Sequence, residues 1–143
     1  MMRRNKQIAE ELGLPWGERK MTFNSRLAQE LAKWAECRGR GDAFHAAAFR
    51  AYFVDGKNIG KIDGLVGLAE NVGLPGPEAR TVLQSRTYRQ EVDADWDRAY
   101  QLGITAVPTF VLGRQMVVGA QPYEALEQLL IANHVSKRDP APE

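Results

Sequence analysis

Hydrophobic positions recur at three- and four-residue steps through most of the chain, a spacing that places them on one face of an α-helix. Gly13, Gly73 and Gly103 each follow such a pattern and precede an apolar residue. This is a helix-ending signal, because glycine enters the left-handed conformation at low cost. The pattern predicts six helices, over residues 3–12, about 25–38, 43–54, 63–72, 77–83 and 87–102.

The pattern then changes to short runs of β-branched and aromatic residues. Residues 107–112 and 115–118 flank the dipeptide Gly113-Arg114, which predicts a β-hairpin with a type II′ turn. Pro122 then opens a last helix that extends to about residue 134. Residues 135–143 lack any period and are expected to form a flexible tail. The predicted fold class is therefore α+β and mostly helical.

The apolar faces predict the core. The second helix carries Leu27, Leu31 and Trp34 on one stripe, and we expect Cys37 to pack beside them as an unreactive thiol. The third helix is apolar over so wide an arc that we expect it to be sandwiched between neighbours. Its apolar residues are Phe44, Ala48, Phe49, Ala51, Tyr52 and Phe53. Inward positions are also expected for Trp96, Tyr123, Leu126, Leu129 and Leu130.

Composition limits the possible classes. The chain has 143 residues, of which 44% are hydrophobic and 26% charged, as in a globular domain of ordinary size. A net charge of +1 gives no electrostatic footprint for nucleic acid or an anionic membrane. No apolar run is long enough to span a bilayer, and the basic start is followed by a helical pattern instead of a signal sequence. We therefore expect a cytoplasmic protein.

Few residues suggest catalytic chemistry. Cys37 is the single cysteine, which excludes an intrachain disulfide, a CxxC pair and a cysteine-based metal site. His45 and His134 are isolated and are interpreted as structural. Residues 56–62 resemble a phosphate loop, but the glycine spacing is short and Ile62 replaces the hydroxyl residue that binds magnesium. The sequence thus assigns no catalytic residue, no metal site and no cofactor.

One segment carries a family resemblance. The run Val107-Pro108-Thr109-Phe110, followed by Gly119-Ala120-Gln121, resembles the cis-proline segment of the DsbA-like thioredoxin superfamily, and its FrnE-type branch matches best. Three upstream segments resemble the helical insertion of that branch, and the likeness covers most of residues 8–132. The upstream segments are residues 24–35, 44–53 and 60–73.

The resemblance implies an incomplete thioredoxin-like fold. It would form one domain over residues 1–134, with the helical insertion over about 1–102 and the cis-proline hairpin and last helix over about 105–134. Members of the family begin with a strand and a Cys-Pro-x-Cys motif, for which this sequence has no counterpart. We therefore expect no thiol–disulfide activity from this chain by itself.

The resemblance also implies a binding site. In the family, the backbone of the residue before the cis-proline binds extended substrate, and the matching positions here are Val107 and Pro108. Candidate ligands are an extended peptide or glutathione.

Two alternatives stay open. One is a relative of the glutathione-dependent 2-hydroxychromene-2-carboxylate isomerases and kappa-type transferases, which use serine in place of the first cysteine. The other is a non-catalytic helical scaffold that self-associates. A homodimer is expected because the hairpin would present an unpaired edge and an uncovered apolar face bearing Phe110, Leu112 and Val117.

Overall fold

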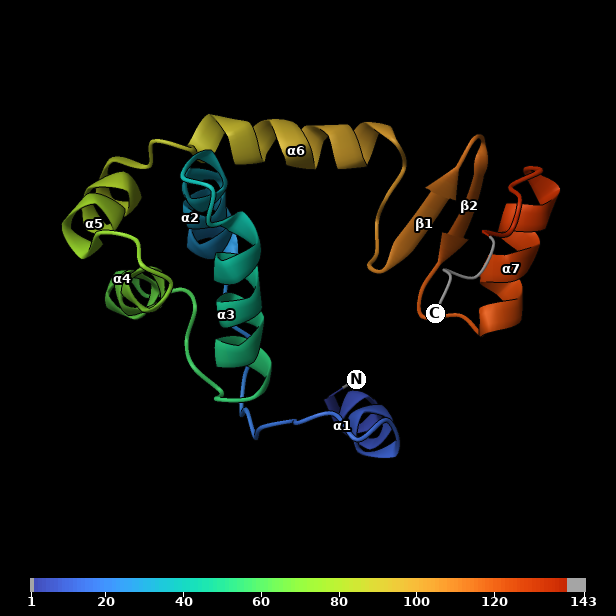
Figure 1. Cartoon of the computed structure of the whole chain (residues 1–143), viewed down its shortest axis with the longest axis horizontal. Coiled ribbons are helices and arrows are strands. Elements are labelled where there is room, and N and C mark those ends of the chain that lie inside the picture. The colour runs from blue at the N-terminus through green and yellow to red at the C-terminus, as the bar shows by residue number, and fades with distance from the viewer. Residues whose placement is uncertain (1, 139–143) are drawn as a thin grey trace. The chain divides into compact units, whose positions relative to one another are not determined.

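A computed structural model gives the structure of residues 2–138. The chain divides into two compact units, one extending to Asp95 and the other beginning at Trp96, and each is described by itself. The elements (Figure 1) are α1 (Met2–Glu11), α2 (Arg26–Cys37), α3 (Gly41–Phe53), α4 (Ile62–Asn71), α5 (Gly76–Ser85), α6 (Arg89–Gln101), β1 (Thr109–Leu112), β2 (Gln115–Val118) and α7 (Tyr123–Ala132). This order confirms the mostly helical α+β prediction. Among the described helices, none has both the length and the apolar character needed to cross a bilayer.

Helix α2 is the centre of the first unit and packs against α3, α4 and α5. Its residues Leu31, Trp34 and Ala35 are buried, as the stripe of hydrophobic positions predicts. The neighbouring helices contribute large side chains that are fully or almost fully buried, namely Phe44, Leu65 and Leu83. A helix that contacts three others must be apolar on several sides, and α2 accordingly holds six buried residues.

One of those six residues is an acid. The carboxylate of Glu30 is only 1% exposed and accepts hydrogen bonds from Arg26, one helical turn earlier, and from Arg86, which follows α5. Burying a charge is unfavourable unless it is paired and hydrogen-bonded. Glu30 therefore connects α2 to the segment between α5 and α6.

The predicted glycine helix ends are confirmed at α1 and α4. Gly13 and Gly73 have φ angles of +66° and +80°. The amide that follows each glycine donates back into the helix, from Leu14 to the Ala9 carbonyl at 2.8 Å and from Leu74 to the Ala69 carbonyl at 2.9 Å. These bonds satisfy carbonyl groups that the helix itself leaves unpaired.

Helix starts differ by one or two residues from the prediction. Asp42 and Asp63, which stand at the predicted starts of the third and fourth helices, lie in the first turns of α3 and α4, which begin at Gly41 and Ile62. A carboxylate in the first turn still favours the helix, because the N-terminal end of the helix dipole is positive. The sequence signal is therefore electrostatic rather than a side-chain cap.

Several aromatic side chains expected to be buried are exposed. Phe49 is 63% exposed, because α3 contacts α2 and α4 through its Phe44 and Ala51 side. On α6, Val92 is buried but Trp96 is 53% exposed. In α7, Tyr123 and Leu130 are exposed and Leu129 is buried. Periodicity identifies an apolar face but does not reveal how far the neighbouring element extends over it.

The second unit contains the hairpin. Strands β1 and β2 pair antiparallel with Leu112 opposite Gln115 and Thr109 opposite Val118, which confirms the predicted hairpin. Gly113 has a φ of +60°, the sign that a type II′ turn requires at its first central residue.

Helix α7 packs on β2, and the side chain of Asn133, the C-terminal cap of α7, donates to Gln115 at 2.8 Å. Gln115 shares its face of the hairpin with Leu112 and Val117, so α7 covers the face that was expected to be open. The other face, with Val111, Met116 and Val118, is the more exposed one. Phe110, at the far end of the covered face, remains 40% exposed.

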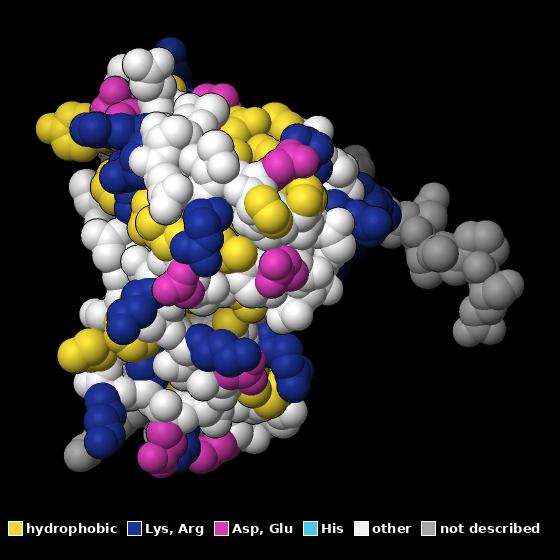
Figure 2. Space-filling model, turned by 90° about the vertical axis from the view of Figure 1, so that its left-hand side faces the viewer, with side chains coloured by type: hydrophobic (Ala, Val, Ile, Leu, Met, Phe, Trp, Pro, Cys, Tyr) yellow, Lys and Arg dark blue, Asp and Glu magenta, His cyan; other side chains and the backbone are white. Residues whose placement is uncertain are grey.

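The surface is electrically mixed. On the face that Figure 2 shows, lysine and arginine side chains alternate with acidic ones and with scattered hydrophobic groups. This distribution agrees with the net charge of +1.

Candidate substrate-binding site

The candidate site begins where α6 ends. Gly103 has a φ of +73°, and the next amide, of Ile104, donates to the Ala99 carbonyl at 3.0 Å. This ends the helix and directs the chain toward β1. Between the helix and the strand, the Thr109 hydroxyl donates to the Ala106 carbonyl at 2.6 Å. These bonds hold the segment 104–109 at both ends and leave Val107 and Pro108 between them.

Pro108 extends the hairpin ladder by one position. The Val107–Pro108 peptide bond is cis, the geometry that the resemblance implies. The Pro108 carbonyl accepts a hydrogen bond from the Gly119 amide at 2.7 Å. Proline has no N–H to return, and a strand end tolerates this loss better than a strand centre. Pro108 therefore lies at the end of the β1–β2 ladder.

Val107 is 87% exposed. Within residues 2–138, no hydrogen bond uses its backbone amide or its carbonyl. A free donor and a free acceptor on one accessible residue are the groups with which a β-strand binds an extended chain. The structure thus places the predicted residues Val107 and Pro108 side by side at the open start of a strand.

The edge of β1 continues this arrangement. In an antiparallel pair, residues that bond the partner strand alternate with residues whose main-chain groups point away from it. Because Pro108 bonds to Gly119, the alternation directs the N–H and C=O groups of Thr109 and Val111 to the outer edge. The described sheet has two strands, so these groups have no partner strand within residues 2–138.

The Gly119-Ala120-Gln121 segment follows β2. Gly119 has a φ of +87°, and the Gln121 side-chain amide donates to the Val118 carbonyl at 2.9 Å. This bond satisfies an acceptor at the end of β2 and turns the chain toward α7. The segment therefore supports the hairpin on the side opposite to the outer edge of β1.

Cys37 was expected to be packed, and this prediction is wrong. The residue ends α2 and is exposed, because the buried stripe of α2 passes through Trp34 and Ala35. A side-chain hydrogen bond with Cys37 raises the pKa of Tyr88, the residue directly before α6. Cys37 and Val107 belong to different units.

The histidines and the glycine-rich loop have structural surroundings. The His45 Nε2 atom lies 3.2 Å from a carboxylate oxygen of Glu36. Residues 56–61 connect α3 to α4, and the Gly60 amide donates to the Asn58 side chain at 2.8 Å. Among residues 2–138, no group of three or more histidine, cysteine or acidic side chains is placed to hold a metal ion.

The contacts at the C-terminal end of α3 were not predicted from the sequence. At this end of the helix, Tyr52 and Phe53 are in contact with Trp16 and Arg19 from the segment before α2. That segment has no periodic pattern that would indicate the contact. The ring centres of Trp16 and Phe53 lie 5.5 Å apart with the ring planes tilted by 39°, and the Arg19 guanidinium lies 3.7 Å from the centre of the Tyr52 ring. The available sequence signal was the second apolar side of the third helix, which carries Phe49 and Phe53.

The sequence is similar to that of known proteins. The model of the DSBA-like thioredoxin domain family matches residues 1–131. The uncharacterized protein YwbO of Bacillus subtilis (strain 168) is 36% identical over 105 residues, which are 73% of this chain and 52% of YwbO. This chain thus spans about half the length of that relative.

Solved structures of DsbA-type proteins share the fold of this chain. The probable DsbA oxidoreductase SCO1869 from Streptomyces coelicolor is 36% identical with a TM-score of 0.76, over 94% of this chain and 59% of that one. The cytosolic disulfide reductase DsbM from Pseudomonas aeruginosa, solved with GSH, is 25% identical with a TM-score of 0.62, over 90% of this chain and 74% of DsbM. The chain is a member of the DSBA-like thioredoxin domain family.

Proposed function

We propose that this chain supplies the substrate-binding part of a DsbA-like oxidoreductase and binds an extended peptide through the backbone of Val107. The observation that carries the proposal is that the amide and carbonyl of Val107 have no hydrogen-bond partner within residues 2–138, while the residue is 87% exposed beside Pro108. The outer edge of β1 extends this surface through Thr109 and Val111. Main-chain hydrogen bonds of this kind give affinity for a peptide backbone with little dependence on its side chains.

The ligand class is a thiol-containing peptide, either glutathione or a protein segment. DsbM, which shares the fold, was solved with GSH, and this supports glutathione as the smallest candidate. The cytosolic character of DsbM likewise supports the proposed cytoplasmic location. Within the family, the Gly119-Ala120-Gln121 segment after the hairpin favours the FrnE-type branch.

The proposed role does not include dithiol exchange by this chain alone. Such exchange needs an attacking thiol and a resolving thiol, and the sequence contains one cysteine, Cys37. Binding would therefore be separable from redox turnover. An isomerase or transferase of the glutathione-dependent kind would share the binding step, but no residue of the described site favours that reaction.

We also propose that the free edge of β1 pairs with a second copy of the chain. The outward main-chain groups of Thr109 and Val111, which face no partner strand in the described part of the chain, lie beside the exposed side chains of Val111, Met116 and Val118. An open edge next to an apolar face favours strand addition. A homodimer and a bound peptide would then compete for the same edge.

Amide chemical shifts measured during titration with reduced glutathione test the binding proposal. We expect the largest changes at Val107, Thr109 and Val111. The variant Val107→Pro, which removes the amide donor, should abolish binding, whereas Val107→Ala, which keeps the backbone, should retain it. Shift changes confined to residues 26–95, or equal binding by the two variants, would contradict the proposal.

A further inference from the structure

The C-terminal end of α3 carries an aromatic cluster in which Phe49 is exposed and the other rings are half-buried. Phe49 and Phe53 stack with ring centres 6.1 Å apart, and Tyr52 and Trp16 contact Phe53 at 4.8 and 5.5 Å. Phe49 is 63% exposed. An exposed cluster of aromatic residues marks an interaction surface more often than an isolated exposed side chain does.

Two backbone contacts hold this cluster in place. The Gly17 amide donates to the Phe53 carbonyl at 2.9 Å, and the Arg19 side chain donates to the Tyr52 carbonyl at 3.1 Å. The segment before α2 is therefore fixed against the end of α3. The surface is preformed, which lowers the entropy cost of binding.

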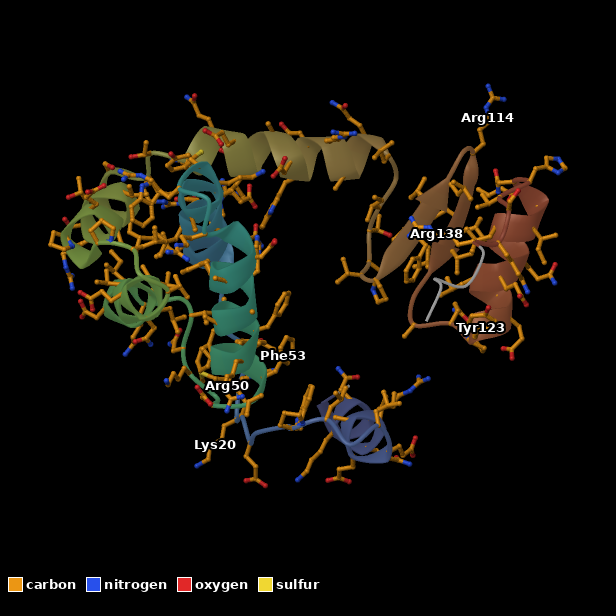
Figure 3. The ribbon with its side chains drawn as sticks, in the orientation of Figure 1. Lys20, Arg50, Phe53, Arg114, Tyr123 and Arg138 are labelled. Atoms are coloured by element: carbon orange, nitrogen blue, oxygen red, sulfur yellow. The ribbon has the colours of Figure 1, made fainter. Side chains whose placement is uncertain are left out.

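Cationic side chains lie at the end of α3 that carries the aromatic rings. Arg19 lies over Tyr52, and Figure 3 shows Lys20 and Arg50 at the same end of α3 as Phe53. Within residues 2–138, none of the three forms an ion pair. The neighbouring acids Glu18 and Asp55 pair with Lys6 and Lys57. The buried Nε of Arg19 also has no acceptor in the described part of the chain.

An apolar pocket adjoins the cluster between α2 and α3. Its volume is about 330 Å³, and Phe49 and Tyr52 belong both to the pocket wall and to the aromatic cluster. The remaining apolar walls include Ala28, Ala32, Phe44 and Ala48. Since small-molecule sites span about 300–1,000 Å³, this pocket has room for one ring or one bulky side chain.

We propose that the cation-rimmed aromatic surface of Trp16, Arg19, Lys20, Phe49, Arg50 and Phe53 docks an acidic polypeptide segment. One aromatic or bulky aliphatic side chain of the segment enters the pocket beside Phe49, and its carboxylates meet Arg50, Lys20 and Arg19. Charge complementarity selects this partner, because Arg19, Lys20 and Arg50 form no ion pair within residues 2–138 and lie at the end of α3 that carries the aromatic cluster. Nucleic acid is disfavoured, since it needs an extended basic surface and the chain has a net charge of +1.

Binding of a synthetic peptide tests the proposal. The probe is a short capped peptide of aspartate, glutamate and glycine around one tryptophan. The comparison peptides carry lysine in place of the acids, or serine in place of the tryptophan. We expect calorimetry to detect the acidic tryptophan peptide, with affinity that falls as salt is raised. We also expect amide shifts to change near residues 16–20 and 45–53.

Variants separate the two parts of the surface. Lys20→Glu and Arg50→Gln should each raise the dissociation constant about three- to tenfold. Phe49→Ala should raise it about fivefold or more. The matched controls are Arg114→Glu, at the hairpin turn, and Tyr123→Ala, an exposed aromatic residue of α7 (Figure 3); both should leave the affinity unchanged. Circular dichroism establishes that each variant is folded.

Several results would overturn the proposal. They are undetectable binding of the acidic peptide, equal binding of the lysine peptide, and equal losses in the controls. Preferential binding of a single-stranded oligonucleotide at the same surface would also overturn it. None of these results depends on Val107, so the docking surface and the glutathione site fail or succeed separately.

Discussion

The guanidinium of Arg86 forms a two-pronged contact with the carboxylate of Glu30, through Nε at 2.7 Å and Nη2 at 2.6 Å. Arg86 holds a left-handed backbone conformation with a φ of 55° at the C-terminal cap of α5, and the two residues are 56 positions apart in sequence. The contact fixes the junction of α5 and α6 to the centre of α2. Two predictions follow from it.

Replacing Arg86 should destabilise the first unit. Arg86→Met leaves the Glu30 carboxylate with Arg26 alone, and we expect the free energy of unfolding to fall by about 1–3 kcal/mol. Urea denaturation followed by circular dichroism measures the change. The control is Arg80→Met, which breaks the exposed pair with Asp63 and should change stability by less than about 0.5 kcal/mol. Equal effects of the two variants would contradict the assigned role of Glu30.

The same contact makes the stability of the fold depend on pH. Hydrogen bonds from Arg86 and Arg26 hold the pKa of Glu30 below its ordinary value of 4.5, although burial acts in the opposite direction. Stability from this group is therefore complete above pH 4.5 and is lost as the pH falls through the lowered pKa of the folded state. Unfolding curves across the acid range should show this loss in the wild type. In Glu30→Gln the slope should be smaller, and an unchanged slope would exclude Glu30 as its source.

Two glycines should respond to alanine in opposite directions. A Cβ atom at Gly17 would lie 1.8 Å from the Val54 carbonyl oxygen, whereas one at Gly67, inside α4, would meet nothing within 4 Å. Gly17→Ala should therefore lower the melting temperature. Gly67→Ala should raise stability by about 0.5–1 kcal/mol, because alanine favours helix interiors. Differential scanning calorimetry of both variants checks the contrast.

The chain alone should not catalyse disulfide reduction. With dithiothreitol as reductant, insulin precipitation should proceed at the rate of the protein-free blank, and Cys37→Ser should not change that rate. The reason is the lack of a second thiol in the sequence. Turnover that disappears in Cys37→Ser would show instead that this exposed thiol works with an external partner.

The proposed dimer should depend on the edge of β1. Light scattering after size exclusion should give twice the chain mass of 16.0 kDa for the wild type. Val111→Lys places a charge beside the open edge and should yield the monomer. The control Val135→Lys alters an equally exposed valine that follows α7. A wild-type mass of 16.0 kDa at all concentrations would exclude the dimer.

The local elements of this protein were predictable from sequence. Glycine-ended helices at Gly13 and Gly73 and a two-residue turn at Gly113 depend on neighbours within a few positions, and the structure confirms them. Phe49, Trp96 and Cys37 were assigned wrongly to the core, because their burial depends on where a distant element ends. A sequence period carries no information about that boundary.

Glu30 shows a second limit. It lies three residues after Leu27 and four before Trp34, so its position on the buried stripe was visible. Its arginine partner in the segment after α5 was not, since only the assembled helices bring the two together. The same holds for Arg19 and Tyr52. For the proposed binding site, the resemblance indicated Val107 and Pro108, but the structure was needed to show that Val107 is exposed and that the outer edge of β1 has no partner strand within residues 2–138.

The position of Pro108 in the ladder has a consequence for any strand that adds to β1. Its carbonyl points to β2, so the N–H that proline lacks would also have pointed inward. An incoming strand therefore encounters the outward groups of Thr109 and Val111 without a gap in the donor sequence. Pro108 therefore ends the hairpin on the side that faces β2. The outer edge of β1 keeps the alternating donors and acceptors of an ordinary strand.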